Sequence, residues 1–162
     1  MDPKVRVSTL IRSHDDPEKV KDSVNSIFPD WEPSNYPERF SFPVTRSSEI
    51  ISAEIHSIDG LLSILRENRV LDTALDAMAM KAHKGGTVFY LSRQSASIGK
   101  VSFVLEENAL GGLIEVTLEG QDIEIWLEQQ TWHTGRERIP REVGDEYAMA
   151  SDGEASEWFQ SS

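Results

Sequence analysis

Eight residues near the middle of the chain, Arg93 to Lys100, combine side chains that suit the recognition of a phosphate. Arg93 can direct two parallel hydrogen bonds to a phosphate group, and Lys100 adds a mobile positive charge. Gln94, Ser95 and Ser97 lie between them and can donate to phosphate or sugar oxygens. The chemistry that these residue types favour is the binding of an anion, with nucleic acid as the first candidate.

The charge pattern around these residues agrees with that interpretation. The chain has 28 acidic and 16 basic residues and a formal net charge of -12, yet residues 77–105 contain no Asp or Glu. Lys81, Lys84, Arg93 and Lys100 give this acid-free segment a formal charge of +4, so the other residues sum to -16. A surface without carboxylates is available to a polyanion. An ordinary strand–turn–strand whose bases offset acidic neighbours explains the pattern equally well.

Two aromatic residues in the acid-free segment offer a ring on which a nucleic-acid base could stack. Phe89 and Tyr90 are consecutive in an expected strand, so their side chains point to opposite faces of the sheet. One ring belongs to the core, and the other is a stacking surface if that face is open. The candidate RNA-binding residues are therefore Arg93, Gln94, Ser95, Ser97, Lys100, Lys81, Lys84 and Tyr90.

Hydrophobic periodicity predicts the elements that position these residues. Alternation predicts a first strand, and Asp15 or Asp16 followed by Pro17 predicts the start of a helix that Pro29 ends. A break near Asn68 is expected within the main helical region. The expected strands cover residues 5–11, 49–58, 87–92, 100–105 and 113–118, and the expected helices cover 17–28, 60–82 and 121–130, with a loop or single helical turn at 93–99.

This order of elements predicts an α+β fold in two layers. The last three strands are separated by short turns, so we expect them to pair as an antiparallel meander. Helices should cover one face of a mixed, largely antiparallel sheet. A chain of 162 residues suits one domain, expected at 1–133, followed by a mixed-charge and then acidic tail at 134–162 that is expected to be disordered.

Composition narrows the classes of protein further. No apolar run approaches the roughly 18 residues that a membrane helix requires, and no signal peptide is evident, so we expect a cytoplasmic protein with no membrane partner. The chain has no cysteine, which excludes disulfides and thiolate chemistry. Many acids with few lysines are typical of proteins from the salt-rich cytoplasm of halophilic archaea; an ordinary acidic protein with an acidic tail is the alternative.

The sequence shows no catalytic motif. His14, Asp15 and Asp16 could form a metal cluster, but helix capping already explains the acids, and no second set of ligands has suitable spacing. Walker, nucleophile-elbow, His-Glu-x-x-His and dinucleotide-binding motifs are absent. We therefore expect a protein that is not an enzyme and that uses no metal or other cofactor.

Three segments resemble the signature of a family of uncharacterised archaeal proteins, described as predicted RNA-binding proteins and as predicted exosome-associated subunits. They are Leu71–Ala74, Phe89–Ala96 and Ile98–Phe103, and the resemblance extends from Val5 to about Trp126. It implies a fold like that of the ribosomal protein that binds 5S RNA, and it brings no catalytic residues. This chain departs from the family pattern at four positions, with Ser92 for Asn, Arg93 for Lys, Ser95 for Ala and Leu75 for a basic residue.

The leading hypothesis from sequence is a non-catalytic RNA-binding protein, associated with the ribosome or with RNA-processing machinery. Four phosphate contacts to a single strand would lose about 10³ to 10⁴ in affinity between ~0.1 M and ~2 M salt, so stacking and shape would have to contribute. The alternative is a dimeric or adaptor module without RNA binding, whose sheet face or edge pairs with a protein.

Overall fold

The computed structural model describes residues 2–34, 36, 48–105 and 112–137, which form an α+β fold around one five-stranded sheet. The strands are β1 (Lys4–Ile11), β2 (Glu49–Ile55), β3 (Gly86–Ser92), β4 (Phe103–Val104) and β5 (Leu113–Glu119). Their order across the sheet is β2-β1-β5-β3-β4, and every pairing is antiparallel. The expectation of a mixed sheet is thus refined to a purely antiparallel one.

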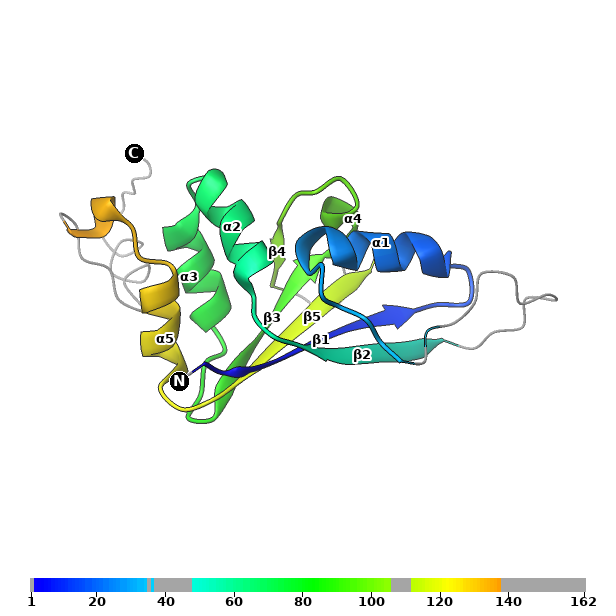
Figure 1. Cartoon of the computed structure of the whole chain (residues 1–162), viewed down its shortest axis with the longest axis horizontal. Helices are drawn as coiled ribbons and strands as arrows, with labels where there is room; N and C mark the ends of the chain where they lie inside the picture. The colour runs from blue at the N-terminus through cyan, green and yellow to red at the C-terminus, as the bar shows by residue number, and fades with distance from the viewer. Residues whose placement is uncertain (1, 35, 37–47, 106–111, 138–162) are drawn as a thin grey trace.

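The helices gather on one side of this sheet and leave the other side uncovered (Figure 1). They are α1 (Pro17–Ile27), α2 (Asp59–Glu67), α3 (Leu71–Ala79), the single turn α4 (Arg93–Ala96), α5 (Ile123–Gln130) and a 3-10 turn at Thr134–Glu137. The two-layer prediction is confirmed. One layer is the sheet, the other is the set of helices, and the opposite sheet face carries no helix of the described residues.

Alternation along the strands explains which sheet face the helices cover. Val5, Val7 and Ile11 of β1 are buried, whereas Arg6 and Leu10 between them are exposed. The central strands β3 and β5 alternate in the same way, so one apolar face meets the helices. Burial of each large side chain in that layer contributes about 1.5–3 kcal/mol, which fixes the sheet in this orientation.

The connection after α1 is anchored in the same core. Trp31 is fully buried, and its indole Nε1 donates a hydrogen bond of 2.8 Å to the carbonyl oxygen of Val7. Its ring meets the ring of Tyr36 edge-on, with centroids 6.1 Å apart. Trp31 and Tyr36 therefore attach the start of this connection to the core. Residues 37–47, which continue the connection, lie outside the described part.

Most predicted elements are present, and the differences are local. Asp16 caps α1 by accepting a hydrogen bond from the Glu18 amide at 3.0 Å, with Pro17 at the first helical position. The expected helical break is present, and Arg69 has a left-handed φ of 58° there. The strand expected at 100–105 is paired only at Phe103–Val104, and the strand expected at 49–58 ends at Ile55.

The C-terminal region is described only in part. Thr134–Glu137 form one 3-10 turn, and the rest of the tail expected at 134–162 lies outside the described residues. Within the described part, every helix is too short or too polar to cross a bilayer.

Candidate interaction site on the open sheet face

Arg93, the leading phosphate ligand predicted from sequence, is buried and bonded within the protein. Its side chain is 7% exposed, and Nη2 donates to Asp15 Oδ2 at 3.0 Å. Nη1 donates to Thr9 Oγ1 at 2.8 Å and to the Leu10 carbonyl at 2.7 Å. The expectation that Arg93 faces a ligand is corrected, because the side chain is buried and three of its five N–H donors are already bonded within the protein.

Arg93 instead joins segments that are distant in the sequence. Its amide donates to the Gly112 carbonyl at 3.2 Å, and the guanidinium packs so closely on Gly112 that a Cβ there would lie 2.5 Å from Nη2. We call Arg93, Asp15, Thr9 and Gly112 the Arg93 clamp. The charge of Arg93 also acts on Tyr36, which is not part of the clamp. Burial raises the pKa of Tyr36 to about 12, and the positive charge of Arg93 acts to lower that pKa. The clamp holds the ends of β1, β3 and β5 together.

The acidic residues before α1 have structural duties as well. Asp16 caps the helix, and Asp15 accepts from both Arg93 and the Arg12 amide, the latter at 2.8 Å. His14 Nε2 lies 3.7 Å from Asp15 Oδ1 on the exposed side. In residues 2–34, 36, 48–105 and 112–137, no three metal-ligating side chains gather into one group.

The other predicted RNA-binding residues fall into two groups. Lys84 lies just before β3, and the Lys81 ammonium lies over the ring of Tyr90, nearer the other end of that strand. Gln94, Ser97 and Lys100 are exposed beyond the end of β3. The seven residues of β3 span about 20 Å, so the length of the strand separates Lys84 from the residues beyond its end. The Ser95 hydroxyl donates to Ser102 Oγ at 3.0 Å, and the Ser97 hydroxyl donates to the Gln94 carbonyl at 2.6 Å.

Phe89 and Tyr90 lie on opposite faces of the sheet, as the alternation of side chains along a strand requires. Phe89 is buried in the core and lies 5.8 Å from the ring of Phe103. Tyr90 is half-buried on the open face, and the Lys81 ammonium lies 4.9 Å from the centroid of its ring. Tyr90 is thus the ring that a ligand on the open face could reach.

The strand registers arrange the side chains of the open face in rows that cross the sheet. Ile50 lies opposite Leu10, and the β1–β5 register continued by one residue sets Leu113 beside Leu10. We call these three residues the apolar row. Ile50 is 73% exposed and Leu10 is 39% exposed. Such a row is available for a contact that would remove it from water.

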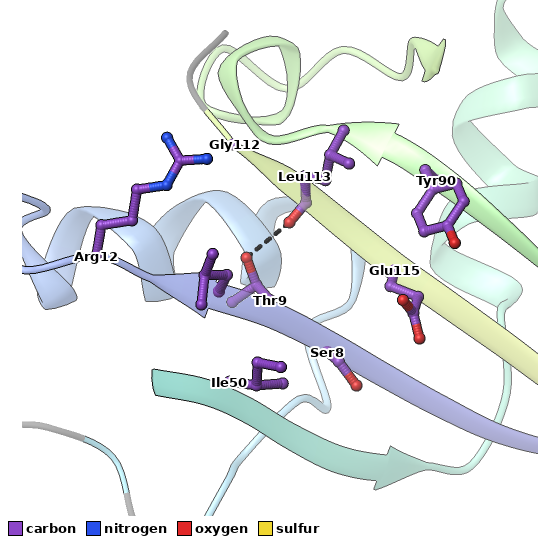
Figure 2. Close-up of a pocket in the computed structure, with 9 residues that line it drawn as sticks. Ser8, Thr9, Arg12, Ile50, Tyr90, Gly112, Leu113 and Glu115 are labelled. Carbon is purple, nitrogen blue, oxygen red and sulfur yellow. Dashed lines mark hydrogen bonds between the residues drawn. The ribbon is translucent and has the colours of Figure 1, made fainter. Parts of the chain in front are cut away.

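The next row across the sheet contains two short serine side chains, and a hollow forms beside it. Ser52, Ser8, Glu115 and Tyr90 are successive cross-strand partners, and we call them the serine row. Ser8 Oγ donates to Ser52 Oγ at 2.9 Å. Because the Ser8 side chain is short, a hollow of about 160 Å³ opens between Ser8, Glu115 and Tyr90 of this row, the apolar row and Arg12. Figure 2 shows Arg12 at one end of the hollow and Glu115 with Tyr90 at the other.

The strands carry positive and negative charges in equal number on this face, and the Lys81 ammonium lies at its edge beside Tyr90. Lys4, Arg6 and Arg12 are matched by Glu54, Glu115 and Glu119. Arg6 and Glu54 form an exposed ion pair of 3.3 Å, which contributes little to stability. Arg12 and Glu115 have no ion-pair partner among the residues that the structure describes. The face therefore lacks the positive field that draws in a polyanion.

Sequence reasoning missed most of the residues around this hollow. Of the predicted RNA-binding residues, only Tyr90 lines it, and Leu10, Arg12, Ile50, Leu113 and Glu115 were not singled out. The available signal was weak: Leu10 and Ile50 are apolar residues at positions where the strand alternation puts a side chain on the polar face.

The fold and this face define a class, a two-layer α+β protein with a five-stranded antiparallel sheet open on one side. The chain belongs to the archaeal UPF0201 family. It is 31% identical over 135 residues to a UPF0201 protein of Sulfurisphaera tokodaii, covering 79% of this chain and 88% of that one. A UPF0201 protein of Methanothermobacter thermautotrophicus is 28% identical over 144 residues, covering 88% and 98% of the two chains. No family model matches.

Solved structures share the fold. The crystal structure of a UPF0201 protein from Methanococcus jannaschii superposes with a TM-score of 0.67 at 22% identity, covering 81% of this chain and 94% of that one. A second UPF0201 crystal structure gives a TM-score of 0.63 at 25% identity, covering 77% and 90%. The predicted archaeal family is confirmed. RNA binding, exosome association and the likeness to the 5S RNA-binding protein stay predictions.

Proposed function

We propose that this protein is a non-catalytic interaction module that binds a polypeptide on the open face of its sheet. The observation that carries the proposal is the apolar row beside the hollow. Complete burial of a Leu or Ile side chain contributes about 1.5–3 kcal/mol, and Ile50 is 73% exposed before any partner binds. Apolar patches rimmed by polar residues are typical of protein–protein contact sites.

The chemistry of the face favours a polypeptide over a nucleic acid. Aliphatic side chains such as Ile50, Leu10 and Leu113 complement apolar side chains, whereas single-stranded nucleic acids are bound by basic grooves and stacking rings. Arg12 and Glu115 offer charges of both signs at the two ends of the hollow, which suits a partner that also carries both signs. These features support the alternative function over the leading one.

Site-specific photo-crosslinking tests the proposal. A photoreactive residue at position 50 is expected to give discrete polypeptide adducts in cells, because this side chain protrudes from the open face. Position 98 is the matched control, since Ile98 is 70% exposed but lies beyond α4, away from that face. Equal adducts at both positions, or adducts at position 50 that ribonuclease removes, would contradict the proposal.

RNA binding is the second candidate, favoured by the Lys81 ammonium 4.9 Å from the centre of the Tyr90 ring and by Lys84, which is exposed just before β3. Lys81→Glu with Lys84→Glu is expected to reduce RNA crosslinking at least about 10-fold, because a repulsive charge replaces an attractive one at each position. Lys100→Glu, beyond the far end of β3, is the control and should have a smaller effect. Wild-type protein that crosslinks to no RNA would remove this candidate.

A further inference from the structure

We infer that the polypeptide bound at the open face is a second copy of this chain, packed face to face about a two-fold axis that runs along the apolar row. The inference rests on the proposed function, since it names the partner of the same site. In a two-fold interface the same patch is used twice, so it must complement itself. The open face meets this requirement in both shape and charge.

The shape requirement follows from the spacing along β1. Arg12 lies two residues beyond Leu10, and Ser8 lies two residues before it, so both stand about 7 Å from the apolar row on opposite sides. A two-fold axis along the row sets apolar row against apolar row. It also places Arg12 of each copy over the hollow of the other, where the arginine stem can cover apolar surface.

The charge requirement is met by Arg12 and Glu115. Glu115 is the cross-strand partner of Ser8, so within one copy its backbone lies about 13 Å along the strands from that of Arg12, and the two side chains form no ion pair with each other. Across the axis, Arg12 reaches the row that contains the partner's Glu115. Two equivalent ion pairs then form per dimer, and both charged groups gain the partner that they lack within the described part of one chain.

A charge exchange gives the decisive test. We expect sedimentation equilibrium in about 0.15 M salt to show a dimer, and Arg12→Glu and Glu115→Arg each to weaken association at least about 10-fold. The double variant should restore it. Each single change alters the net charge of -12 by two, to -14 or to -10. General repulsion would therefore weaken one variant and strengthen the other, whereas pairing across the axis weakens both.

Matched variants separate this inference from the proposed function. Lys100→Glu also gives a net charge of -14 but lies off the open face, and it should associate almost like the wild type. Ile50→Asp should abolish the dimer, with circular dichroism confirming its fold. A wild type that is monomeric at 0.1 mM, or a double variant that stays weak, overturns the inference. Crosslinks from position 50 to another protein, or to residues 138–162 of the same chain, overturn it while leaving polypeptide binding at this face in place.

Discussion

Replacing Arg93 with alanine is expected to lower the free energy of unfolding by about 3 kcal/mol, since it leaves the largely buried Asp15 carboxylate without its cation. The change also removes the donors that Thr9 Oγ1 and the Leu10 carbonyl accept from. Arg93→Lys keeps the charge but cannot form the same fork, so a smaller loss is expected. Urea unfolding followed by circular dichroism measures both. An Arg93→Ala protein as stable as the wild type would contradict the clamp.

Gly112 provides a control for the geometry of the clamp. Its φ is 90°, and a Cβ there would lie 2.5 Å from Arg93 Nη2, so Gly112→Ala should both strain the backbone and displace the guanidinium. In the double variant with Arg93→Ala, the added Cβ no longer meets the guanidinium. Gly112→Ala then adds only the cost of its backbone strain to the cost of Arg93→Ala. The two losses should therefore sum to more than the loss in the double variant. Simple additivity would show that the two residues do not act together.

Trp31→Ala is expected to cost about 3–5 kcal/mol, because it empties the volume of a fully buried indole. Trp31→Phe retains much of the packing but removes the 2.8 Å hydrogen bond to the Val7 carbonyl, and a loss of about 1–3 kcal/mol is expected. Urea unfolding by circular dichroism suits both variants, since it does not depend on the tryptophan that is removed.

Trp132→Ala is the matched control for the buried indole. Trp132 is 44% exposed, so its replacement should change stability by less than about 0.5 kcal/mol. If the two tryptophans had equal effects, the connection after α1 would not be held by core packing.

The two sheet faces differ in the residues that they carry, although the chain as a whole has a net charge of -12. The helix-covered face takes up the apolar residues of the strand alternation, and the open face receives charges of both signs together with Leu10 and Ile50. In the proposed dimer, an apolar row on a face with charges of both signs would limit repulsion between two acidic chains. Electrostatic complementarity of this kind sets orientation more than affinity.

Local signals were sufficient for the elements of the fold. Alternation in residues 5–11, the capping sequence before Pro17 and the break near Arg69 act through neighbouring residues, so the sequence predicts them within one or two positions. The strand expected at 100–105 was too long. Only Phe103–Val104 pair with β3, and strand length depends on a partner that the local sequence does not contain.

The candidate site depended on contacts that local signals do not encode. The residue types of the acid-free segment indicated an anion site, yet the fork of donors on Arg93 is used by Asp15, Thr9 and Leu10, which are 78 to 84 positions away in the chain. The local sequence around an arginine does not show whether its side chain will be buried or will bind a ligand. Only the position of the partners distinguishes them.

By itself, the sequence determined the α+β class, the alternation that buries one sheet face, and the assignment of one ring of Phe89 and Tyr90 to the core. Tertiary structure alone decided that β1 lies between β2 and β5, which brings Ile50, Leu10 and Leu113 into one row. It also decided that Ser8 lies beneath a hollow and that Arg93 is enclosed. The physical reason is that side-chain direction is set by each residue's own strand, whereas neighbours across a sheet are set by pairing between strands far apart in the chain.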